Sequence, residues 1–539
     1  MSTPLQSAIS DWRSALGEHS VIAQGAALHT YGQDTSDYSA PPAVVLRPCN
    51  LEQVHHVVRI ASAHKVPLHP ISSGNNWGYG SANAYTPGCA VVDLSTMDSI
   101  VHFDEEIGLI TIEPGVTQGK LRAWLDARGL DFMVPTTGAG PTCSLVGNAL
   151  ERGYGLTPYA DHFSAVVSLE AVLPDGSLYQ SPLGTGPLSS GFKWGIGPYL
   201  DGLFTQGNIG IVTSMTLALS RRPRVVETFY FWVNDDSDLE EVVTRVRGCL
   251  REAGSNIGGI NLISAARFLA MSDTSSREAG RYPRPLKAIE HEAREAGGAA
   301  WMGVGAIYGT EGHAAATRRL VKIQIGPVAK RIAFFSLKKI RLIERILKWL
   351  PGKKSRQLLG TTKLMKEGLD LLEGRPGEVA LPLAYTGSGT PQDSQMYRNP
   401  ARDGCGLLWY APIIPMTPVD ARRFIQMARD ICTKHGFEAP LTLSSLSDRS
   451  FDCTLPILFD RRDGQMCSSA DACWRDLCNS GRKLGFVPYR VHARYGLQFA
   501  ADDRNAFWEV ARRVKEAIDP KHIISPGRWH EDPSAQDSN

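Results

Sequence analysis

The sequence is short of the features that mark membrane, nucleic-acid-binding and secreted proteins. No apolar segment approaches the roughly 18 residues of a membrane-spanning helix. The 57 Lys and Arg residues nearly balance the 55 Asp and Glu residues, and the net charge of +2 predicts no general attraction to nucleic acid or membranes. The first residues, MSTPLQSAISDWRSALGEH, have no basic stretch followed by an apolar run, so we expect no secretory signal.

Cysteine is present but is never paired closely along the chain. The ten cysteines include no C-x-x-C pair, and the nearest approach to a cluster is Cys467, Cys473 and Cys478. That spacing suits neither a zinc ribbon nor a haem site. We therefore predict no metal site and expect free thiols in a reducing compartment, the cytoplasm, with disulfides or a metal site as the alternatives.

The common nucleotide-binding motifs are also missing. No Gly-Lys-Ser or Gly-Lys-Thr occurs, which excludes a Walker loop. Residues 138–143 (GAGPTC) begin like a G-x-G-x-x-G fingerprint, but they end in Cys and contain Pro. Neither a helix start nor an acidic residue about twenty positions later supports a Rossmann site.

The pattern that is present predicts an α+β protein with more than one domain. A chain of 539 residues is long enough for two or more domains. In the first 220 residues, an amphipathic helix is expected at 51–64 and a hairpin turn at Asp175-Gly176. Short strands are expected there at 43–46, 89–94, 109–112 and 166–173.

The pattern of predicted strands and helices changes after Arg221-Arg222-Pro223 and again near residue 480. We expect strands at 227–233, 300–310 and 403–416, and helices at 238–252, 312–329 and 418–436. The last segment contains short strands and one helix at 502–517. These changes divide the chain into residues 1–221, 222–479 and 480–539.

A basic stretch lies at residues 330–356. It carries ten Lys or Arg residues against one acid, Glu344, interleaved with Ile, Leu and Phe. A solvated amphipathic helical face is the plainest interpretation. Contact with a membrane surface or an acidic partner, and a flexible lid, are the alternatives.

Four glycine-rich loops are the main evidence for a ligand. They are 72–81 (SSGNNWGYGS), 137–148 (TGAGPTCSLVGN), 153–162 (GYGLTPYADH) and 207–213 (GNIGIVT). Glycine allows close backbone approach, so that successive N–H groups converge on an anion. Four such loops in one inferred domain indicate a large ligand that contains a pyrophosphate.

These loops carry a family resemblance. Together with the Tyr-Arg pair in GFVPYRVH (485–492) and the ending IDPKHIISPGRW (518–529), they resemble the vanillyl-alcohol oxidase flavoprotein family, especially its members that oxidise 4-substituted phenols. The resemblance covers nearly the whole chain and is weakest at 225–400. It implies a two-part FAD-binding domain, 1–221 with 480–539, around a central cap domain, 222–479, that supplies the substrate pocket.

The resemblance also implies which residues form the site. Two tyrosines and one arginine hold the substrate phenolate in the family, and they correspond to Tyr79, Tyr489 and Arg490. The residues expected to bind FAD are Ser73, Gly74, Asn75, Asn76, Gly78, Gly80, Ser81, Gly138, Ser144, Gly147, Asn148, Tyr159, Asp161, His162, Gly207, Ile211, Val212 and Arg528. The expected substrate-pocket residues are Leu156, Leu407 and Trp409.

Three departures from the family pattern shape the expectation. Leu407 stands where many relatives have the His that bonds FAD, so we predict dissociable FAD, with a bond to Tyr410 as a weak alternative; Asn75 and Asn76 replace the His of other branches. No carboxylate lies near residues 138–140, where the oxidases have an Asp. Leu156 replaces a pocket tyrosine, for which Tyr154 is a nearby substitute, so a bulkier or more apolar para substituent is expected.

Three functions stay open from the sequence. The first is FAD-dependent oxidation of a para-substituted phenol through a quinone methide. The second is oxidation of a non-phenolic alcohol, amine or natural-product intermediate, with Tyr79 or Tyr489 as base. The third is a flavin-binding sensor without turnover. The expected partners are a small aromatic substrate and, as acceptor, O2 or an electron-transfer protein; relatives imply a homo-oligomer.

Overall fold

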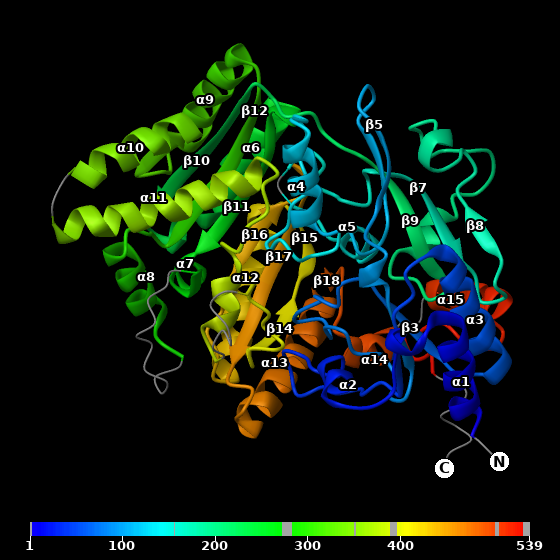
Figure 1. Ribbon diagram of the computed structural model, residues 1–539. Coiled ribbons are helices and arrows are strands. Elements are labelled where there is room, and N and C mark those ends of the chain that lie inside the picture. The colour runs from blue at the N-terminus through cyan, green and yellow to red at the C-terminus, as the bar shows by residue number, and fades with distance from the viewer. Residues whose placement is uncertain are drawn as a thin grey trace.

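Three β-sheets organise the chain in the computed structural model, which describes residues 3–155, 157–271, 283–349, 352–388, 396–501 and 506–531. Figure 1 shows the N-terminal sheets on one side of the molecule and the third, larger sheet on the other. The predicted α+β class is confirmed by this arrangement.

The first sheet has the strand order β1-β2-β4-β3, with β2 and β3 both parallel to β4. Helices α1 and α3 pack on it through Trp12 and the apolar face of α3. Helix α3 begins after Asn50, whose side chain accepts a hydrogen bond from the Gln53 N–H, and the expected helix at 51–64 is confirmed. The elements are α1 (Pro4–Leu16), β1 (Val21–Ile22), α2 (Ala26–Thr30), β2 (Val44–Leu46), α3 (Leu51–His64), β3 (Leu68–Ile71) and β4 (Ala90–Asp93).

The second sheet is antiparallel, with the order β5-β6-β9-β7-β8. Helices α4 and α5 share its apolar core. The expected hairpin turn at Asp175-Gly176 is confirmed, because it joins β7 to its antiparallel partner β8. The elements are β5 (Ile100–Asp104), β6 (Leu109–Ile112), α4 (Gln118–Ala127), α5 (Leu145–Leu150), β7 (Val166–Val172), β8 (Leu178–Gln180) and β9 (Ile211–Ala218).

The third sheet is antiparallel and has nine strands, β13-β10-β12-β11-β16-β17-β15-β18, with β14 paired to β17. Its strands are β10 (Val225–Val233), β11 (Ile257–Ser264), β12 (Trp301–Gly309), β13 (Arg331–Phe335), β14 (Gly406–Tyr410), β15 (Pro412–Pro415), β16 (Thr442–Ser445), β17 (Ser450–Phe459) and β18 (Val487–Pro488). It shares the largest apolar core with helices α6 (Leu239–Ala253), α9 (Glu311–Ile325), α12 (Pro418–Lys434) and α13 (Gly464–Lys483). The division of the chain at 221 and 479 stays a prediction, although this sheet extends to β18.

The other helices lie around this sheet and at the C-terminus. They are α7 (Ala265–Met271), α8 (Leu286–Glu295), α10 (Leu337–Trp349), α11 (Lys353–Leu372), α14 (Gly496–Ala501) and α15 (Ala506–Ile518). In the expected helix at 502–517, residues 502–505 lie outside the described ranges, and α15 forms the remainder. Helix α14 was not expected from the sequence.

Two expected elements differ from the structure. The strand expected at 403–416 is two strands, β14 and β15, because Pro412 has no N–H to continue the ladder. The basic stretch at 330–356 is not helical throughout, since it begins with strand β13.

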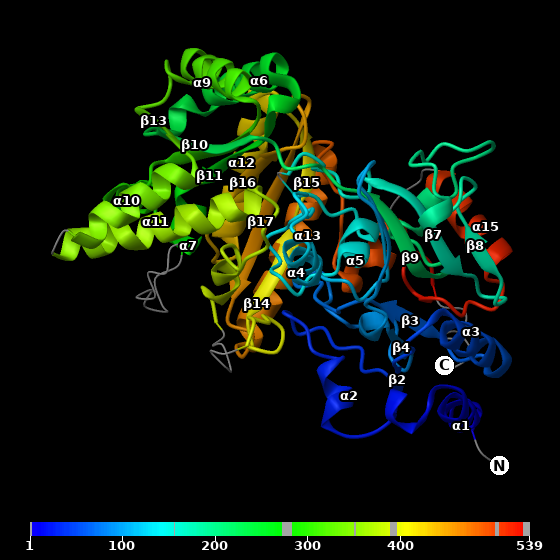
Figure 2. The same cartoon turned by 45° about the horizontal axis from the view of Figure 1, so that its top comes forward.

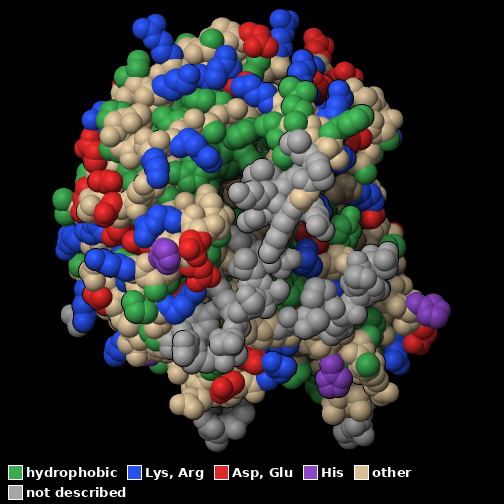
Figure 3. All heavy atoms as spheres, turned by 90° about the vertical axis from the view of Figure 1, so that its left-hand side faces the viewer, with side chains coloured by type: hydrophobic (Ala, Val, Ile, Leu, Met, Phe, Trp, Pro, Cys, Tyr) green, Lys and Arg blue, Asp and Glu red, His purple; other side chains and the backbone are tan. Residues whose placement is uncertain are grey.

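The rest of the basic stretch belongs to a pair of helices, α10 and α11, that projects from the third sheet (Figures 1 and 2). Ile340 and Leu347 face inward, whereas Leu342, Ile346 and Trp349 are exposed. Figure 3 faces this side of the molecule and shows Lys and Arg side chains among exposed hydrophobic ones. None of the helices in the described ranges combines the length and apolarity needed to cross a membrane.

The C-terminal residues return to the first sheet. The Leu68 N–H donates to the Ile523 carbonyl over 2.7 Å, and the Ser525 N–H donates to the Leu68 carbonyl over 2.7 Å. Ile523 and Ile524 are buried in the core of that sheet. This return places Gly527 and Arg528 beside Tyr85, in the segment that follows the 72–81 loop.

Candidate active site

A cavity of about 410 Å³ lies where the three sheets meet. Its wall includes Val212 of β9, Leu407 and Trp409 of β14, and Thr454 of β17, together with the 72–81 loop. The volume falls within the usual range for small-molecule sites. Among the described residues, no group of three or more His, Cys, Asp and Glu side chains is arranged to hold a metal ion.

Most of the residues expected to bind FAD lie on this wall. They are Ser73, Gly74, Asn75, Asn76, Ser81, Gly138, Ser144, Gly147, Asn148, Gly207, Val212 and Arg528. They come from three of the four glycine-rich loops, from β9 and from the C-terminal return. The folded chain therefore brings together segments that are far apart in sequence.

Six of the expected residues do not line the cavity. Gly78 packs under Trp409 and Gly80 against Ala493, so both shape the wall from behind. His162 is buried and its Nδ1 lies 2.6 Å from Asn148 Nδ2. The other three lie away from the cavity wall. Tyr159 is exposed, and Ile211 lies in the core of the first sheet. Asp161 accepts hydrogen bonds from the Phe163 and Ser164 N–H groups.

The wall fits an anionic cofactor with close backbone contacts. At Gly147, an added Cβ would lie 2.2 Å from Ser72 Oγ, so a larger residue would force the Ser72 hydroxyl to move. Arg490 and Arg528 each have a buried Nε–H with no hydrogen-bond acceptor among the described residues. Arg528 could hold the pyrophosphate of FAD together with the serine and asparagine side chains of the 72–81 loop, whereas Arg490 belongs to the clamp described next.

The three residues of the expected phenolate clamp meet in the cavity. The Arg490 guanidinium carbon lies 4.3 Å from the centre of the Tyr79 ring, and Arg490 Nη2 donates to Asn76 Oδ1. The Tyr489 hydroxyl lies close enough to Tyr79 and Arg490 for both groups to influence its pKa. All three line the cavity, although about 410 positions separate Tyr79 from the other two in the sequence.

The positive groups around the clamp are partly balanced by one carboxylate. Glu151 Oε1 accepts a hydrogen bond from Arg528 Nη2 over 2.7 Å, and Glu151 Oε2 lies 3.9 Å from Arg490 Nε. Burial opposes the charge of Glu151, but Arg528 and Arg490 outweigh it and lower the pKa of this carboxyl. Of the described residues that line the cavity, Glu151 is the only acid, so residues 138–140 add no carboxylate there.

A second acid, Asp452, lies behind the clamp and was missed from the sequence. It is 1% exposed on β17, and its Oδ1 has no hydrogen-bond partner among the described residues. Burial raises the pKa of the Asp452 carboxyl well above its usual range, against the opposing effect of Arg490. Its negative charge, when present, raises the pKa of both Tyr79 and Tyr489. No local motif marks this residue, because the three partners come from other segments.

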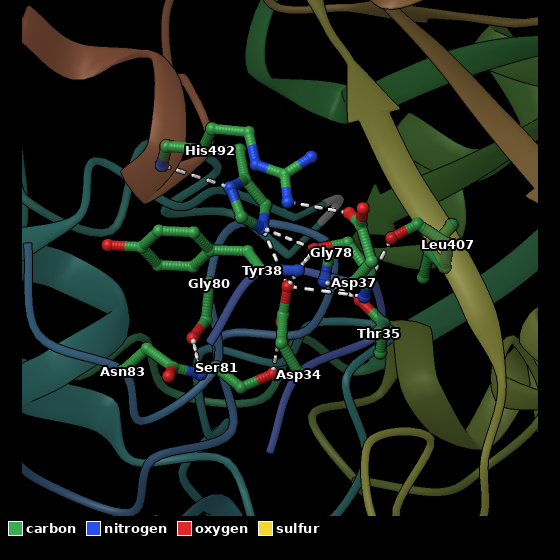
Figure 4. A network of polar contacts seen from close by, with 12 residues as sticks. Asp34, Thr35, Asp37, Tyr38, Gly78, Gly80, Ser81, Asn83, Leu407 and His492 are labelled. Atoms are coloured by element: carbon green, nitrogen blue, oxygen red, sulfur yellow. Dashed lines mark hydrogen bonds and ion pairs between the residues drawn. The ribbon is translucent and has the colours of Figure 1, made fainter. Parts of the chain in front are cut away.

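A buried polar network positions the wall (Figure 4). His492 Nε2 and Asp34 Oδ2 are 2.7 Å apart, and both side chains are fully buried. Burial would raise the pKa of Asp34, but His492, Ser36 and Ser81 outweigh it and lower this pKa to about 2. Asp34 Oδ1 also accepts from the Ser81 hydroxyl over 2.8 Å. This segment was not identified from the sequence, since Ser81 and His492 are more than 40 positions away from Asp34.

The neighbouring Thr35 links two sides of the cavity. Its Oγ1 accepts a hydrogen bond from the Gly78 N–H over 2.9 Å and donates one to the Leu407 carbonyl over 2.8 Å. The Leu407 N–H donates to the Thr35 carbonyl. The 72–81 loop and strand β14 are therefore held in register by one threonine (Figure 4).

The alternation of β14 decides which of its side chains face the cavity. Leu407 and Trp409 line the cavity, whereas Leu408 and Tyr410 belong to the core of the third sheet. The Tyr410 hydroxyl points at Gly481 of α13, where an added Cβ would lie 2.0 Å away. Tyr410 is therefore turned away from the cavity.

Two further residues are candidates for the pocket, Leu156 and its nearby substitute Tyr154. Leu156 lies outside the described residues. Tyr154 lines the cavity with its ring centre 5.4 Å from that of Tyr489. Its hydroxyl is buried without a partner among the described residues, so it is available to a ligand.

Comparison with known proteins agrees with this site. Residues 42–181 match the FAD binding domain family. The chain is 32% identical to 1'-carboxy-chondrochloren decarboxylase of Chondromyces crocatus over 99% of both chains. It is 28% identical to the 4-cresol dehydrogenase [hydroxylating] flavoprotein subunit of Pseudomonas putida, over 97% of this chain and 94% of that one.

Solved structures share the whole fold. The structure of p-cresol methylhydroxylase with substrate bound superposes with a TM-score of 0.86 at 26% identity, covering 98% of both chains. The 4-ethylphenol oxidase of Gulosibacter chungangensis, in an isoeugenol complex, also gives a TM-score of 0.86, at 22% identity over 99% of this chain and 98% of that one; at this identity the likeness is evidence for the fold alone.

Fold, cavity and relatives together define an FAD-dependent oxidoreductase. The cofactor is FAD. The chain belongs to the vanillyl-alcohol oxidase family of flavoproteins, the family of p-cresol methylhydroxylase.

Proposed function

We propose that the enzyme oxidises a para-substituted phenol, which it binds as the phenolate between Tyr79, Tyr489 and Arg490. The observation that carries this proposal is the meeting of these three side chains on one cavity wall. The relatives named for 4-cresol and p-cresol support the same substrate class.

The clamp must supply a definite amount of free energy. A free phenol has a pKa near 10, so ionising it at pH 7 requires a shift of about 3 units, or about 4 kcal/mol. One guanidinium and two hydroxyl donors, each forming a charge-assisted hydrogen bond, are sufficient for this. Ionisation makes the ring electron-rich, which favours loss of hydride from the carbon attached at the para position.

The protonation states of the clamp suit this role. Burial is the largest effect on both tyrosines and raises the pKa of Tyr79 and of Tyr489 above the ordinary value, so both remain donors at neutral pH. Burial opposes the charge of Arg490, but Tyr489, Tyr79 and Glu151 outweigh it and raise the pKa of Arg490. Burial raises the pKa of the Asp452 carboxyl, which favours its neutral form and so reduces its charge against the phenolate.

FAD, when bound, accepts the hydride. The chain's residues hold the phenolate oxygen at one end, while Leu407, Trp409 and Leu381 provide an apolar wall for the para substituent. We infer that FAD is bound without a covalent bond, because Leu407 has no nucleophile and Tyr410 faces the core.

The relative named as a decarboxylase favours a second candidate. In this reaction, hydride loss gives a quinone methide whose side chain carries a carboxylate. The bond from carbon to that carboxylate then breaks and CO2 leaves. Its electron pair forms the new C=C bond and restores the aromatic phenolate. Release of CO2 in step with substrate consumption separates this reaction from simple oxidation.

Anaerobic mixing tests the proposed substrate class. The holoenzyme is mixed with 4-alkyl-, 4-allyl- and 4-(hydroxymethyl)phenols and with their O-methyl ethers, and flavin absorbance is followed. We expect the phenols to bleach the flavin and the ethers to leave it oxidised. Equal bleaching by phenols and ethers would favour a non-phenolic substrate, and no bleaching by any compound would favour a flavin-binding protein without turnover.

Variants of the clamp give the same test a residue-level reading. We expect Tyr489→Phe and Arg490→Lys to lower the rate of flavin reduction by about 10²-fold or more, as the loss of one donor to a developing anion does in other enzymes. Tyr308→Phe is the matched control. Tyr308 lies on β12, does not line the cavity, and donates its hydroxyl hydrogen to the Leu372 carbonyl of α11. Unchanged reduction in both clamp variants would contradict the proposal.

A further inference from the structure

Arg267 is a buried cation that the clamp does not use. It lies on α7, next to the end of β11, and it is 9% exposed. Its backbone N–H donates to Ser264 Oγ, and the same oxygen accepts from the Leu441 N–H. The backbone position of Arg267 is thus fixed by the third sheet, and its side chain reaches the cavity wall.

Among the described residues, no acid pairs with the Arg267 guanidinium. Nε and Nη1 are buried and have no hydrogen-bond acceptor among the described residues. The only acid on the described cavity wall, Glu151, pairs with Arg528 and Arg490 instead. Burial lowers the pKa of Arg267 to about 9, so the group is still positive at neutral pH. An uncompensated buried charge is costly, and proteins retain one where a ligand supplies the counter-charge.

The surroundings of Arg267 indicate the part of the ligand it faces. Its guanidinium carbon lies 5.4 Å from the ring centre of Trp409, whose neighbour Leu407 also lines the cavity. Arg267 therefore belongs to the cap side of the cavity, where the para substituent is expected. The residues expected to hold the pyrophosphate already have a cation of their own, Arg528.

We propose that Arg267 binds a carboxylate on the para side chain of the substrate, which makes the substrate a phenolic acid. The inference rests on the proposed function, because it assumes that the phenolate occupies the clamp. A planar guanidinium donates two parallel hydrogen bonds to a carboxylate, and the Trp409 ring lies within cation–π distance of this one. The substrate is then fixed at both ends by guanidinium groups, Arg490 at the phenolate and Arg267 at the carboxylate.

The experiment measures binding as well as turnover. Three acids of increasing length are titrated into the holoenzyme: 4-hydroxyphenylacetate, 3-(4-hydroxyphenyl)propionate and 4-(4-hydroxyphenyl)butyrate. Each is compared with its methyl ester, and Kd is obtained calorimetrically while flavin reduction is followed separately. We expect at least one acid to bind about 10-fold or more tightly than its ester, as loss of a charge-assisted pair implies.

Variants of Arg267 identify the source of that preference. In Arg267→Met we expect the acid and its ester to bind equally, with the ester within about threefold of wild type; in Arg267→Lys part of the preference is expected to return. Arg222→Met, which removes a cation paired with Glu373, is the control and should keep the full preference. Persistence of the preference in Arg267→Met, or equal weakening of acid and ester, would overturn the proposal.

Stability provides a readout independent of catalysis. Because the buried Nε and Nη1 of Arg267 have no partner in the part of the chain that the structure describes, we expect Arg267→Met to keep or raise the Tm of the ligand-free enzyme. A marked fall in Tm would show a structural role instead and would also overturn the proposal. Failure of the proposed function looks different: no phenol of any charge would reduce the flavin, whatever the acids do in the binding assay.

Discussion

Two buried aspartates near the clamp respond to pH in opposite directions. Asp452 has a raised pKa from burial, and Asp34 has a pKa lowered to about 2 because His492 and two hydroxyls outweigh burial. A carboxyl with a raised pKa binds more protons in the folded state than in the unfolded state. Its contribution therefore turns less favourable as pH rises, whereas that of Asp34 is lost as pH falls.

The Asp452→Asn variant tests the first of these. Asparagine carries no charge at any pH, so the desolvation of a carboxylate is no longer a cost at high pH. We expect the Tm of the variant relative to wild type to increase between pH 5 and pH 9, measured by calorimetry. A Tm difference that is flat across this range would mean that Asp452 does not have a raised pKa.

The Asp34→Asn variant removes the partner of a buried histidine. Loss of one member of a buried ion pair typically costs about 3–5 kcal/mol in unfolding free energy. Asp37→Asn is the matched control, because Asp37 forms a half-exposed pair with Arg494 and should cost less than about 1 kcal/mol. In wild type, the contribution of Asp34 should be present above about pH 4 and lost toward pH 2, as urea unfolding at several pH values would show. Equal costs for the two variants would contradict this assignment.

At the scale of elements, the 72–81 loop packs closely against strand β14. Gly78 has a φ of +79°, and a Cβ there would lie 2.2 Å from Trp409 Cδ1. We expect Gly78→Ala to destabilise the protein and to weaken FAD retention. Gly88→Ala is the control, because Gly88 has a φ of +80° with open space around it. Backbone strain alone costs about 1–2 kcal/mol, so any excess for Gly78, measured by urea unfolding, reports the clash with Trp409; equal costs would contradict it.

The same strand bears on how the cofactor is held. With Leu407 toward the cavity and Tyr410 toward α13, we expect acid precipitation to release all the flavin into the supernatant. Yellow colour that stays with the pellet would show a covalent bond and contradict this inference. Mass spectrometry of the denatured chain provides an independent check.

Local patterns in the sequence predict elements better than they predict the site. Helix α3 is predicted with its ends because its apolar spacing and its cap lie within the helix itself. The single strand expected at 403–416 is wrong, since Pro412 ends one ladder and the partner strands decide the rest. Tyr79, Tyr489 and Arg490 are identified through the family resemblance. Arg267 and Asp452 are not predicted from the sequence, because their roles depend on which side chains lie around them in the folded chain.

At the scale of the whole molecule, we expect bound FAD to stabilise the packing of the three sheets around the cavity. Its expected ligands come from the first and second sheets and from the C-terminal return, while Leu407 and Trp409 of the third sheet close the same cavity. Saturation at 100 times the Kd stabilises a protein by about 2.7 kcal/mol. We therefore expect the Tm of stripped protein to rise steadily with added FAD, whereas adenosine, as the control, should give little change. A Tm that does not respond to FAD would contradict this arrangement.

The contact between Asn76 and Arg490 can form only late in the synthesis of the chain. These residues are 414 positions apart, and Asp34 is 458 positions from His492. At about 5–20 residues per second, a ribosome needs about 20–80 s to make the intervening chain. During that interval Asn76 of the 72–81 loop lacks Arg490 and Asp34 lacks His492, and closing loops of this length is slow. We therefore expect FAD to be captured only after the segment that carries Arg490 and His492 has been made.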